Sequence, residues 1–423
     1  MSLTVKILIG MGAGLLVGFA INAVIFLSGE ESQLANNMQY YLVSGVFDTL
    51  GQIFVRSLKL LIVPMVFVSL VLGAASLGNS ARMGPMALKT IALYLVTTCI
   101  AITFALTMAL LIKPGVGVDL EVVEYAVNDV PSFKETVINI VPENPVKAMA
   151  NTVMLQIIVF SILMGIALSR IGEKGQPVLT FFESMNEVVM KMVMMLMQLA
   201  PYGVFALLAK TVADLGAGAI EQIIKYFLTM VFVLIVHATV VYPTFLKIFT
   251  GLNPVQFFLN IRPTILFAFS TASSNATLPV TMETARDRLG VSRSIASFSL
   301  PLGATINMDG TAIMMGVATV FISQVYGIDI GLQGYLLVVL TAMLASIGTA
   351  GVPGVGTVML TMVLGEVGLP AEGIGMILAV DRLLDMVRTA VNVTGDSMVA
   401  TVVAKTESEI DLKTYRADST VRA

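Results

Sequence analysis

The chain has 423 residues, of which 57% are hydrophobic and only 12% are charged, and its mean hydropathy is +0.92. Soluble domains carry roughly 25% charged residues, so this composition excludes a soluble globular protein and indicates an integral membrane protein. The net charge of −3 does not predict orientation, which depends on where Lys and Arg lie along the chain.

The apolar segments are long enough to cross a membrane as helices. The first, residues 7–28, is uncharged and exceeds the roughly 20 residues that a spanning helix needs. It lacks a small-residue cleavage site, so we interpret it as a retained span and not as a signal peptide. Further segments, each too long for a barrel strand, follow near residues 43–76, 88–112, 147–169, 186–212 and 223–249.

Basic and acidic loops alternate between these spans. The acidic loops are residues 28–32, 119–129 and 213–221. Basic residues follow even numbers of spans, at Lys6, Arg82, Lys89, Arg170, Lys174, Lys247 and Arg262. The positive-inside rule therefore places the N-terminus in the cytoplasm.

Residues 263–282, "PTILFAFSTASSNATLPVTM", do not fit a simple span. Arg262 precedes them and the basic stretch 283–293 follows them, so both flanks favour the cytoplasm. Ser, Thr and Asn gather at the middle of the segment. We expect a re-entrant helical hairpin, because non-helical backbone is tolerated at membrane depth when protein or a water-filled cavity surrounds it.

A second interrupted segment enters from the opposite side. After a span at 294–322, residues 335–373 have the centre "GTAGVPGVG", and the last apolar segment leads to the cytoplasmic stretch 405–416. Two hairpins from opposite sides, each followed by a helix with buried polar residues, form an inverted repeat typical of secondary transporters. The alternative, ten unbroken helices, would place the basic stretch 283–293 outside.

Polar residues interrupt the span that follows the first hairpin. Asn307-Met308-Asp309-Gly310-Thr311 lies within an apolar run, and Gly310 would allow the helix to unwind and free carbonyl ligands. The alternative is a surface loop between two short helices, which the apolar flanks disfavour.

Charged residues of the last span lie on one face of a helix. At 3.6 residues per turn, the spacing of 4, 3, 4 and 4 aligns them, with Thr389 at the edge. They are Asp381, Asp385, Arg388, Asn392 and Asp396. Charges inside a membrane mark a substrate or ion pathway by default. The alternative is an ion-pair network that only fixes helix packing.

Arginines are too few to neutralise these carboxylates. Arg382 and Arg388 face four aspartates when Asp309 is included, so the excess negative charge favours bound cations. The available donors are oxygens, which suit Na⁺ better than a soft metal.

Cys99 and His237 are the chain's one cysteine and one histidine. A single cysteine excludes a disulfide framework and a thiolate metal site. A single histidine excludes a His-based metal centre or proton relay, and we interpret His237 as a lone polar residue in an apolar helix.

Three motifs resemble one known family. "GATINMDGT", "ASIGTAGVPG" and "DMVRTAVNVTGD" are similar, in this order, to signatures of the glutamate transporter family, the dicarboxylate/amino acid:cation symporters. The resemblance covers essentially the whole chain. It implies an all-α integral membrane fold of eight transmembrane helices and two re-entrant hairpins, assembled as a homotrimer, in which a transport domain moves like an elevator.

The resemblance also implies a division of the chain. Scaffold helices 1 and 2 would occupy 1–82 and scaffold helices 4 and 5 would occupy 115–215. The transport domain would comprise helix 3 (83–114), helix 6 (216–250), hairpin 1 (251–290), broken helix 7 (291–327), hairpin 2 (328–369) and helix 8 (370–406), and a cytoplasmic tail would follow (407–423).

The family's substrate site carries over residue by residue. Arg388 would bind the side-chain carboxylate of the substrate, Asp385 its amino group, and Asn392 with the backbone around Ser274 its α-carboxylate, while Thr311 would assist at the side chain. Val352 and Gly356 would belong to the extracellular gate. The remaining implied substrate residues are Ser273, Asn275, Met308 and Thr389.

Three sodium sites are implied in the same way. The first would use Asn307, Asp309, Thr97 and Thr98. The second would use Asp396 and Asn392 with helix carbonyls, and the third would use carbonyls near Met308 and Ser346, with Gly303 also among the implied ligands.

The sequence departs from the family at several positions. Members commonly place a second arginine beside the site, where this chain has Ala272 and Met386, and the usual serine run ends in Asn275. Met315 occupies the position of the proton-carrying glutamate of animal members, which excludes proton coupling through that position. Arg382 is interpreted either as a snorkelling surface residue or as a functional one.

The sequence thus predicts a non-enzymatic, Na⁺-coupled symporter of aspartate or glutamate in the cell membrane, with both termini cytoplasmic and lipid around it but no nucleic-acid partner. Alternatives of the same fold are a proton- or Na⁺-coupled dicarboxylate symporter, which Asp385 disfavours, and a neutral amino acid carrier, which Arg388 disfavours. From other classes, an intramembrane aspartyl protease lacks its G-x-G-D motif here, and an ion channel would conduct without substrate.

Overall fold

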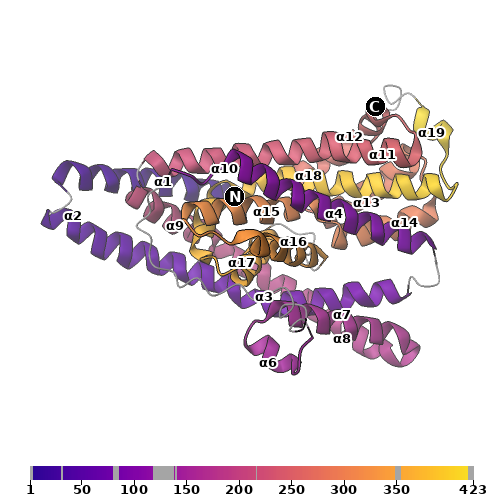
Figure 1. Ribbon diagram of the computed structural model, residues 1–423, viewed down its shortest axis with the longest axis horizontal. Helices are drawn as coiled ribbons and strands as arrows, with labels where there is room; N and C mark the ends of the chain where they lie inside the picture. Colours follow the sequence, from indigo (N-terminus) through magenta and orange to yellow (C-terminus); the bar gives the residue numbers. More distant parts are fainter. Residues whose placement is uncertain are drawn as a thin grey trace.

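The computed structural model describes residues 3–29, 32–79, 85–117, 138, 141–215, 217–347 and 354–417. These residues are almost entirely helical, and most of the helices run along the long axis of the molecule (Figure 1). Six helices within the described ranges are long and apolar enough to cross a membrane: Val5–Ser28, Gln33–Ala75, Met86–Ile112, Gly172–Asp214, Ile220–Thr250 and Arg293–Val325. The predicted all-helical membrane architecture agrees with this finding.

One group of helices packs around α3. Its members are α1 (Leu3–Ser28), α2 (Gln33–Asn37), the π-helix η1 (Met38–Phe47), α3 (Asp48–Asn79), α6 (Pro145–Ala150), α7 (Met154–Arg170), η3 (Gly172–Gly175), α8 (Gln176–Leu196), η4 (Met197–Leu199) and α9 (Ala200–Leu215). The segment expected as a single helix at 147–169 is two helices, because the chain turns at Asn151–Val153.

Three glycines allow α1 to lie directly against α9. Gly10, Gly14 and Gly18 repeat at every fourth residue and therefore share one face of the helix. A Cβ atom at Gly14 would lie 2.7 Å from the carbonyl oxygen of Phe205. Small residues at such spacing are a common means of packing helices closely in membranes.

We expect Gly14→Leu to destabilise the protein by about 1–3 kcal/mol, because a side chain there would force α1 away from α9. Gly12→Leu is the matched control, since a Cβ atom at Gly12 meets nothing within 4 Å. Thermal unfolding of the purified variants in detergent measures both, and equal melting temperatures would contradict the close packing.

A second group packs around α18. Its members are α4 (Pro85–Ile112), α10 (Ala217–Val236), the π-helix η5 (His237–Val241), α11 (Tyr242–Thr250), α12 (Pro254–Thr271), α13 (Ser274–Asp287), α14 (Arg293–Ile306), α15 (Asp309–Val325), α16 (Gly331–Ile347), α17 (Val355–Glu366), η6 (Ala371–Gly373), α18 (Ile374–Thr406) and α19 (Leu412–Arg416).

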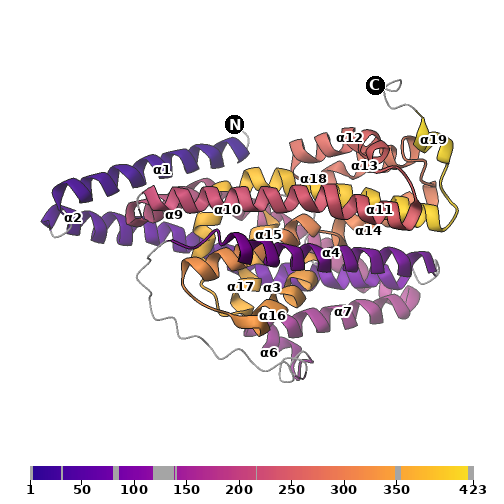
Figure 2. The same cartoon turned by 45° about the horizontal axis from the view of Figure 1, so that its top comes forward.

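Two helix–turn–helix pairs belong to this second group. Helices α12 and α13 pack against each other, and Ala272, at φ 49°, ends α12 in the left-handed conformation before Ser273 caps α13. Helices α16 and α17 also pack together. In Figure 2 the α12–α13 pair lies toward the upper right of the molecule, and the α16–α17 pair lies lower and near the middle.

The predicted interruption between α14 and α15 is confirmed. Asn307 and Met308 have non-helical backbone angles, and α15 begins at Asp309. The role expected for Gly310 was wrong, since Gly310 lies inside α15. A Cβ atom there would lie 2.6 Å from the carbonyl oxygen of Arg388, so glycine is required for close approach to α18.

The segment after α18 returns across the ends of α12 and α14. The Ser292 N–H donates to the Glu409 carbonyl at 3.1 Å, and the Asp411 N–H donates to the Gly290 carbonyl at 2.7 Å. The Tyr415 hydroxyl donates to the carbonyl of Asn253 at 2.9 Å. The first part of the expected cytoplasmic tail is therefore docked on the helical body.

Candidate functional site

The polar face of α18 points into the second helix group. Asp381, Arg388, Asn392 and Asp396 are each less than 10% exposed, and Arg388 is 1% exposed. Helices α12, α14 and α15 pack against α18. The expected alignment of these residues on one buried face is present.

Arg388 lies between two carboxylates of its own helix. Its Nη2 donates to Asp385 Oδ1 at 2.9 Å, and its Nη1 lies 2.8 Å from Asp381 Oδ1. Nη1 is thus engaged in an ion pair with Asp381. Nε has no hydrogen-bond partner among the described residues, so the guanidinium group retains this donor for a ligand.

Arg382 holds the other oxygen of Asp385. Its Nη1 donates to Asp385 Oδ2 at 3.3 Å. The expectation left open whether Arg382 is a surface residue, and the structure places it at the carboxylate expected to bind an ammonium group. Arg382 is therefore a second arginine, beside Arg388, that contacts Asp385.

Side chains from three helices contact the Asp309 carboxylate. Thr98 of α4 donates to Asp309 Oδ1 at 2.6 Å, and Tyr242 of α11 donates to Oδ2 at 2.9 Å. His237 Nε2 lies 3.4 Å from the same Oδ2. The interpretation of His237 as a lone polar residue was therefore wrong, because it and Tyr242 meet the buried acid.

Asp396 lies next to the break between α14 and α15. Asn307 Nδ2 donates to Asp396 Oδ1 at 2.9 Å, and Thr97 Oγ1 donates to Asn307 Oδ1 at 3.5 Å. A Cβ atom at Gly303 would lie 2.5 Å from Asp396 Oδ1 and 2.6 Å from the Tyr94 hydroxyl. Gly303 thus leaves room for this carboxylate, and sequence reasoning missed Tyr94.

Asn392 joins α18 to α15. Its Oδ1 accepts from the Gly310 N–H at 2.7 Å, and its Nδ2 lies 3.6 Å from Met308 Sδ. Thr311 Oγ1 lies 3.9 Å from the same sulfur. Thr389, in contrast, donates its hydroxyl hydrogen to the Asp385 carbonyl at 2.8 Å.

The expected gate and hairpin residues have different surroundings. Gly356 faces Thr311 and Arg388, since its Cβ atom would lie 3.2 Å from Thr311 Cγ2 and 3.8 Å from Arg388 Nη2. Ser346 is buried and donates to the Met343 carbonyl at 2.7 Å. Val352 lies outside the described residues. Of the α12–α13 turn, Ser273 and Ser274 are buried, but Asn275 is exposed and does not join the buried site.

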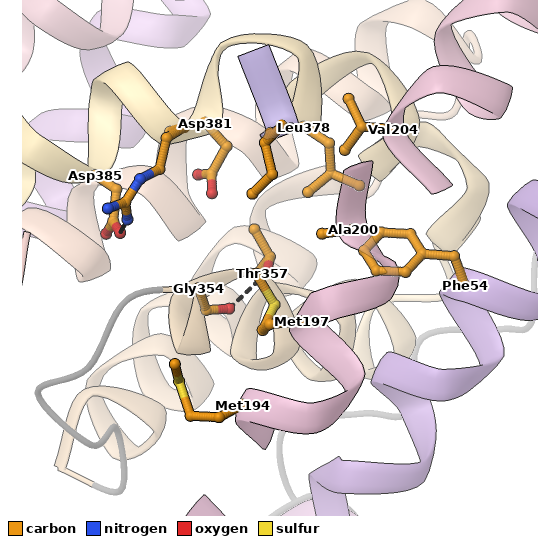
Figure 3. Close-up of a pocket in the computed structure, with 12 residues that line it drawn as sticks. Phe54, Met194, Met197, Ala200, Val204, Gly354, Thr357, Leu378, Asp381 and Asp385 are labelled. Atoms are coloured by element: carbon orange, nitrogen blue, oxygen red, sulfur yellow. Dashed lines mark hydrogen bonds and ion pairs between the residues drawn. The ribbon is translucent and has the colours of Figure 1, made fainter. Parts of the chain in front are cut away.

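A cavity of about 180 Å³ reaches Asp381 and Asp385 from the first helix group. Figure 3 shows the two acids at one end and apolar side chains at the other. The first group contributes Ile7, Phe54, Met194, Met197, Ala200 and Val204, while Gly354, Thr357, Leu378 and Arg382 complete the lining. No sequence signal identified the apolar lining, since its residues resemble ordinary helix-packing residues.

The donors around Asp309 and Asp396 suit a hard cation. Neither carboxylate is paired with a lysine or arginine among the described residues. Their hydrogen-bonding neighbours are hydroxyl and amide groups, together with the His237 ring at Asp309 Oδ2. The described part of the chain holds no cluster of three His, Cys, Asp or Glu side chains that would indicate a transition metal. An oxygen-rich set with unpaired negative charge favours an alkali cation.

Known proteins similar to this chain are transporters. The model of the "Sodium:dicarboxylate symporter family" matches residues 3–406. A "Proton/sodium-glutamate symport protein" of Geobacillus stearothermophilus is 36% identical over 94% of this chain and 93% of its own length. A "Proton/glutamate-aspartate symporter" of Escherichia coli K12 is 36% identical over 92% of this chain and 91% of its own.

More distant similarity extends to other substrates and to animals. A "C4-dicarboxylate transport protein" of Bacillus subtilis is 32% identical over 86% of this chain and 88% of its own length. "Excitatory amino acid transporter 3" of Mus musculus is 32% identical over 94% of this chain and 85% of its own. With its apolar helices and the matched length, this chain is a multi-pass membrane protein and belongs to the sodium:dicarboxylate symporter family, a family of transporters and not of enzymes.

Proposed function

We propose that the protein is a secondary active symporter that couples Na⁺ influx to the uptake of aspartate or glutamate across the cell membrane. The observation that carries this proposal is the ion pair between the buried Arg388 and the half-buried Asp385, 2.9 Å apart. A planar guanidinium group binds a carboxylate with two parallel hydrogen bonds, and a carboxylate beside it binds an ammonium group. An acidic amino acid carries both complementary groups, and two of the relatives are named for glutamate.

A C4-dicarboxylate is the second candidate substrate, since one relative is named for it. A dicarboxylate offers no ammonium group to Asp385, so this carboxylate would repel the ligand instead of binding it. Counterflow in proteoliposomes with labelled aspartate, glutamate, succinate and alanine separates the classes. Exchange of succinate without exchange of either acidic amino acid would overturn the proposed substrate.

Sodium coupling is supported by Asp309 and Asp396, whose neighbours complete an oxygen-rich environment without lysine or arginine. Met315, at the proton-carrier position of the animal family members, carries no titratable group. Uptake should follow an inward Na⁺ gradient at constant pH. Uptake driven by a proton gradient in Na⁺-free buffer would show that these aspartates carry protons instead.

The proposed mechanism moves the second helix group past the first, in each copy of a homotrimer. The cavity between the groups and the close approach of Gly354 to Met197 support a movable contact at that place. The α7–α8, α11–α12 and α13–α14 connections lie at one end of the molecule with α19, which supports a cytoplasmic C-terminal segment (Figure 1). Lys6, ahead of most of the first span, supports a cytoplasmic N-terminus.

Gly354 should be sensitive to any side chain. Its φ is +85°, which side chains rarely adopt, and its Cβ atom would lie 2.6 Å from Met197 Cε. We expect Gly354→Val to reduce uptake at least tenfold without changing the amount of folded oligomer in gel filtration.

Gly365→Ala, in the helix that Gly354 caps, is the control for this prediction, since its Cβ atom meets nothing within 4 Å. Normal uptake by Gly354→Val would show that the start of α17 does not move during transport.

A further inference from the structure

A short π-helical segment places two aromatic side chains on the same acid. In an α-helix, residues five apart point about 140° away from each other. In η5 the Tyr242 N–H donates to the His237 carbonyl, five residues earlier, so the two side chains lie one above the other. Their rings meet edge to face with centroids 4.7 Å apart. Without the π-turn, only one of them could face α15.

Both side chains contact a single oxygen of Asp309. Tyr242 donates its hydroxyl hydrogen to Oδ2 at 2.9 Å, and His237 Nε2 lies 3.4 Å from the same atom. All three side chains are 0% exposed. Because Asp309 is fully buried, the orientation of this oxygen depends on these two protein partners.

The other oxygen of Asp309 contacts a candidate cation ligand. Oδ1 accepts from Thr98 at 2.6 Å, and Thr97, one residue earlier in α4, contacts Asn307. One oxygen of the carboxylate is therefore held by Tyr242 and His237, and the other meets the helix that carries the candidate ligands Thr97 and Thr98.

The geometry points to a role for His237 and Tyr242 as positioning residues of the cation site: they hold Asp309 Oδ2 and so direct Oδ1 toward an alkali cation. This inference rests on the proposed Na⁺ coupling. Partners that orient a ligand in this way typically change metal affinity 10–100-fold when they are removed.

Gly395 makes room for this arrangement. A Cβ atom there would lie 2.6 Å from the Tyr242 hydroxyl and 2.9 Å from Asn307 Nδ2. The Tyr242 hydroxyl can reach Asp309 only because α18 has no side chain at that point. His237 Nδ1 has no partner in the described structure, so the histidine ring is fixed by Asp309 and Tyr242.

The test uses the full-length protein, purified and reconstituted into proteoliposomes. Two quantities are measured for each variant: the Na⁺ concentration that gives half of the maximal Na⁺-dependent rise in melting temperature, and the Na⁺ concentration for half-maximal aspartate or glutamate uptake. Tyr242→Phe and His237→Leu should raise both by about tenfold or more. His237→Gln, which keeps an N–H group within reach of Asp309, should stay within about threefold of the unmodified protein.

Tyr226→Phe is the matched control. Tyr226 lies in α10 and, like Tyr242, is fully buried. Its hydroxyl has no hydrogen-bond partner among the described residues. Its removal should leave both Na⁺ concentrations unchanged.

The outcomes separate this inference from the proposed function. If the unmodified protein shows no response to Na⁺, sodium coupling and the positioning role both fail. If it responds, and Tyr242→Phe and His237→Leu respond at the same Na⁺ concentrations, only the positioning role is overturned. Equal loss of stability in His237→Leu and His237→Gln, with unchanged Na⁺ dependence, would likewise assign His237 to packing alone.

Discussion

Arg388→Cys is expected to abolish binding of aspartate and glutamate. The substitution leaves the side-chain carboxylate of the substrate without a partner and also leaves Asp381 and Asp385 facing each other without the guanidinium group between them. Removing one member of a buried ion pair costs about 3–5 kcal/mol, which corresponds to a loss of affinity of more than a hundredfold. Binding of labelled substrate to the purified protein at saturating Na⁺ measures the change.

Two control variants sharpen this result. Lys405→Gln removes a cation from the far end of the same helix and should leave binding unchanged. Arg388→Lys retains the charge but not the planar fork, so affinity should recover only in part. Unchanged substrate affinity in Arg388→Cys would refute the assignment, whereas new uptake of small neutral amino acids would support it.

Asp309→Asn and Asp396→Asn are expected to flatten the dependence of substrate affinity on Na⁺. Each substitution removes a negative charge that has no lysine or arginine partner among the described residues. A site binds a cation more weakly when its ligands carry less negative charge. Linkage is reciprocal, so a protein that binds Na⁺ weakly also binds the substrate weakly at a given Na⁺ concentration. Affinity measured over a series of Na⁺ concentrations should change at least tenfold less in each variant than in the unmodified protein.

A variant that retains its Na⁺ dependence would change the list of proposed Na⁺ ligands. If either asparagine variant keeps the full Na⁺ dependence, the corresponding carboxylate does not bind the ion. Thr90 of α4 offers a control, because its buried hydroxyl donates only to the Met86 carbonyl of the same helix. Thr90→Val should therefore retain the Na⁺ dependence.

The sequence was informative where function depends on one helix. The face of α18 follows from helical periodicity, and the break at Asn307–Met308 follows from polar residues in an apolar run. Both features need no knowledge of neighbouring helices, so they could be predicted without a structure.

Contacts between distant segments could not be predicted in this way. His237 and Tyr242 meet Asp309 only because a π-turn aligns them, and no periodicity in the sequence reveals that turn. Arg382 was ambiguous for a related reason, since its position on α18 does not show whether it turns toward Asp385 or toward lipid. The apolar wall of the cavity combines residues of both helix groups, whose pairing depends on the whole fold.

The docked segment after α18 has a consequence for biosynthesis. Asn260 Nδ2 donates to the Tyr415 carbonyl at 2.9 Å, and Tyr415 is 1% exposed although it lies near the end of the chain. The α12–α13 pair therefore obtains these partners only when residues 409–415 have left the ribosome. We expect the pair to stay in the membrane until then with Asn260 Nδ2 lacking this acceptor, so that nascent chains stalled before residue 409 expose it to quality-control proteases.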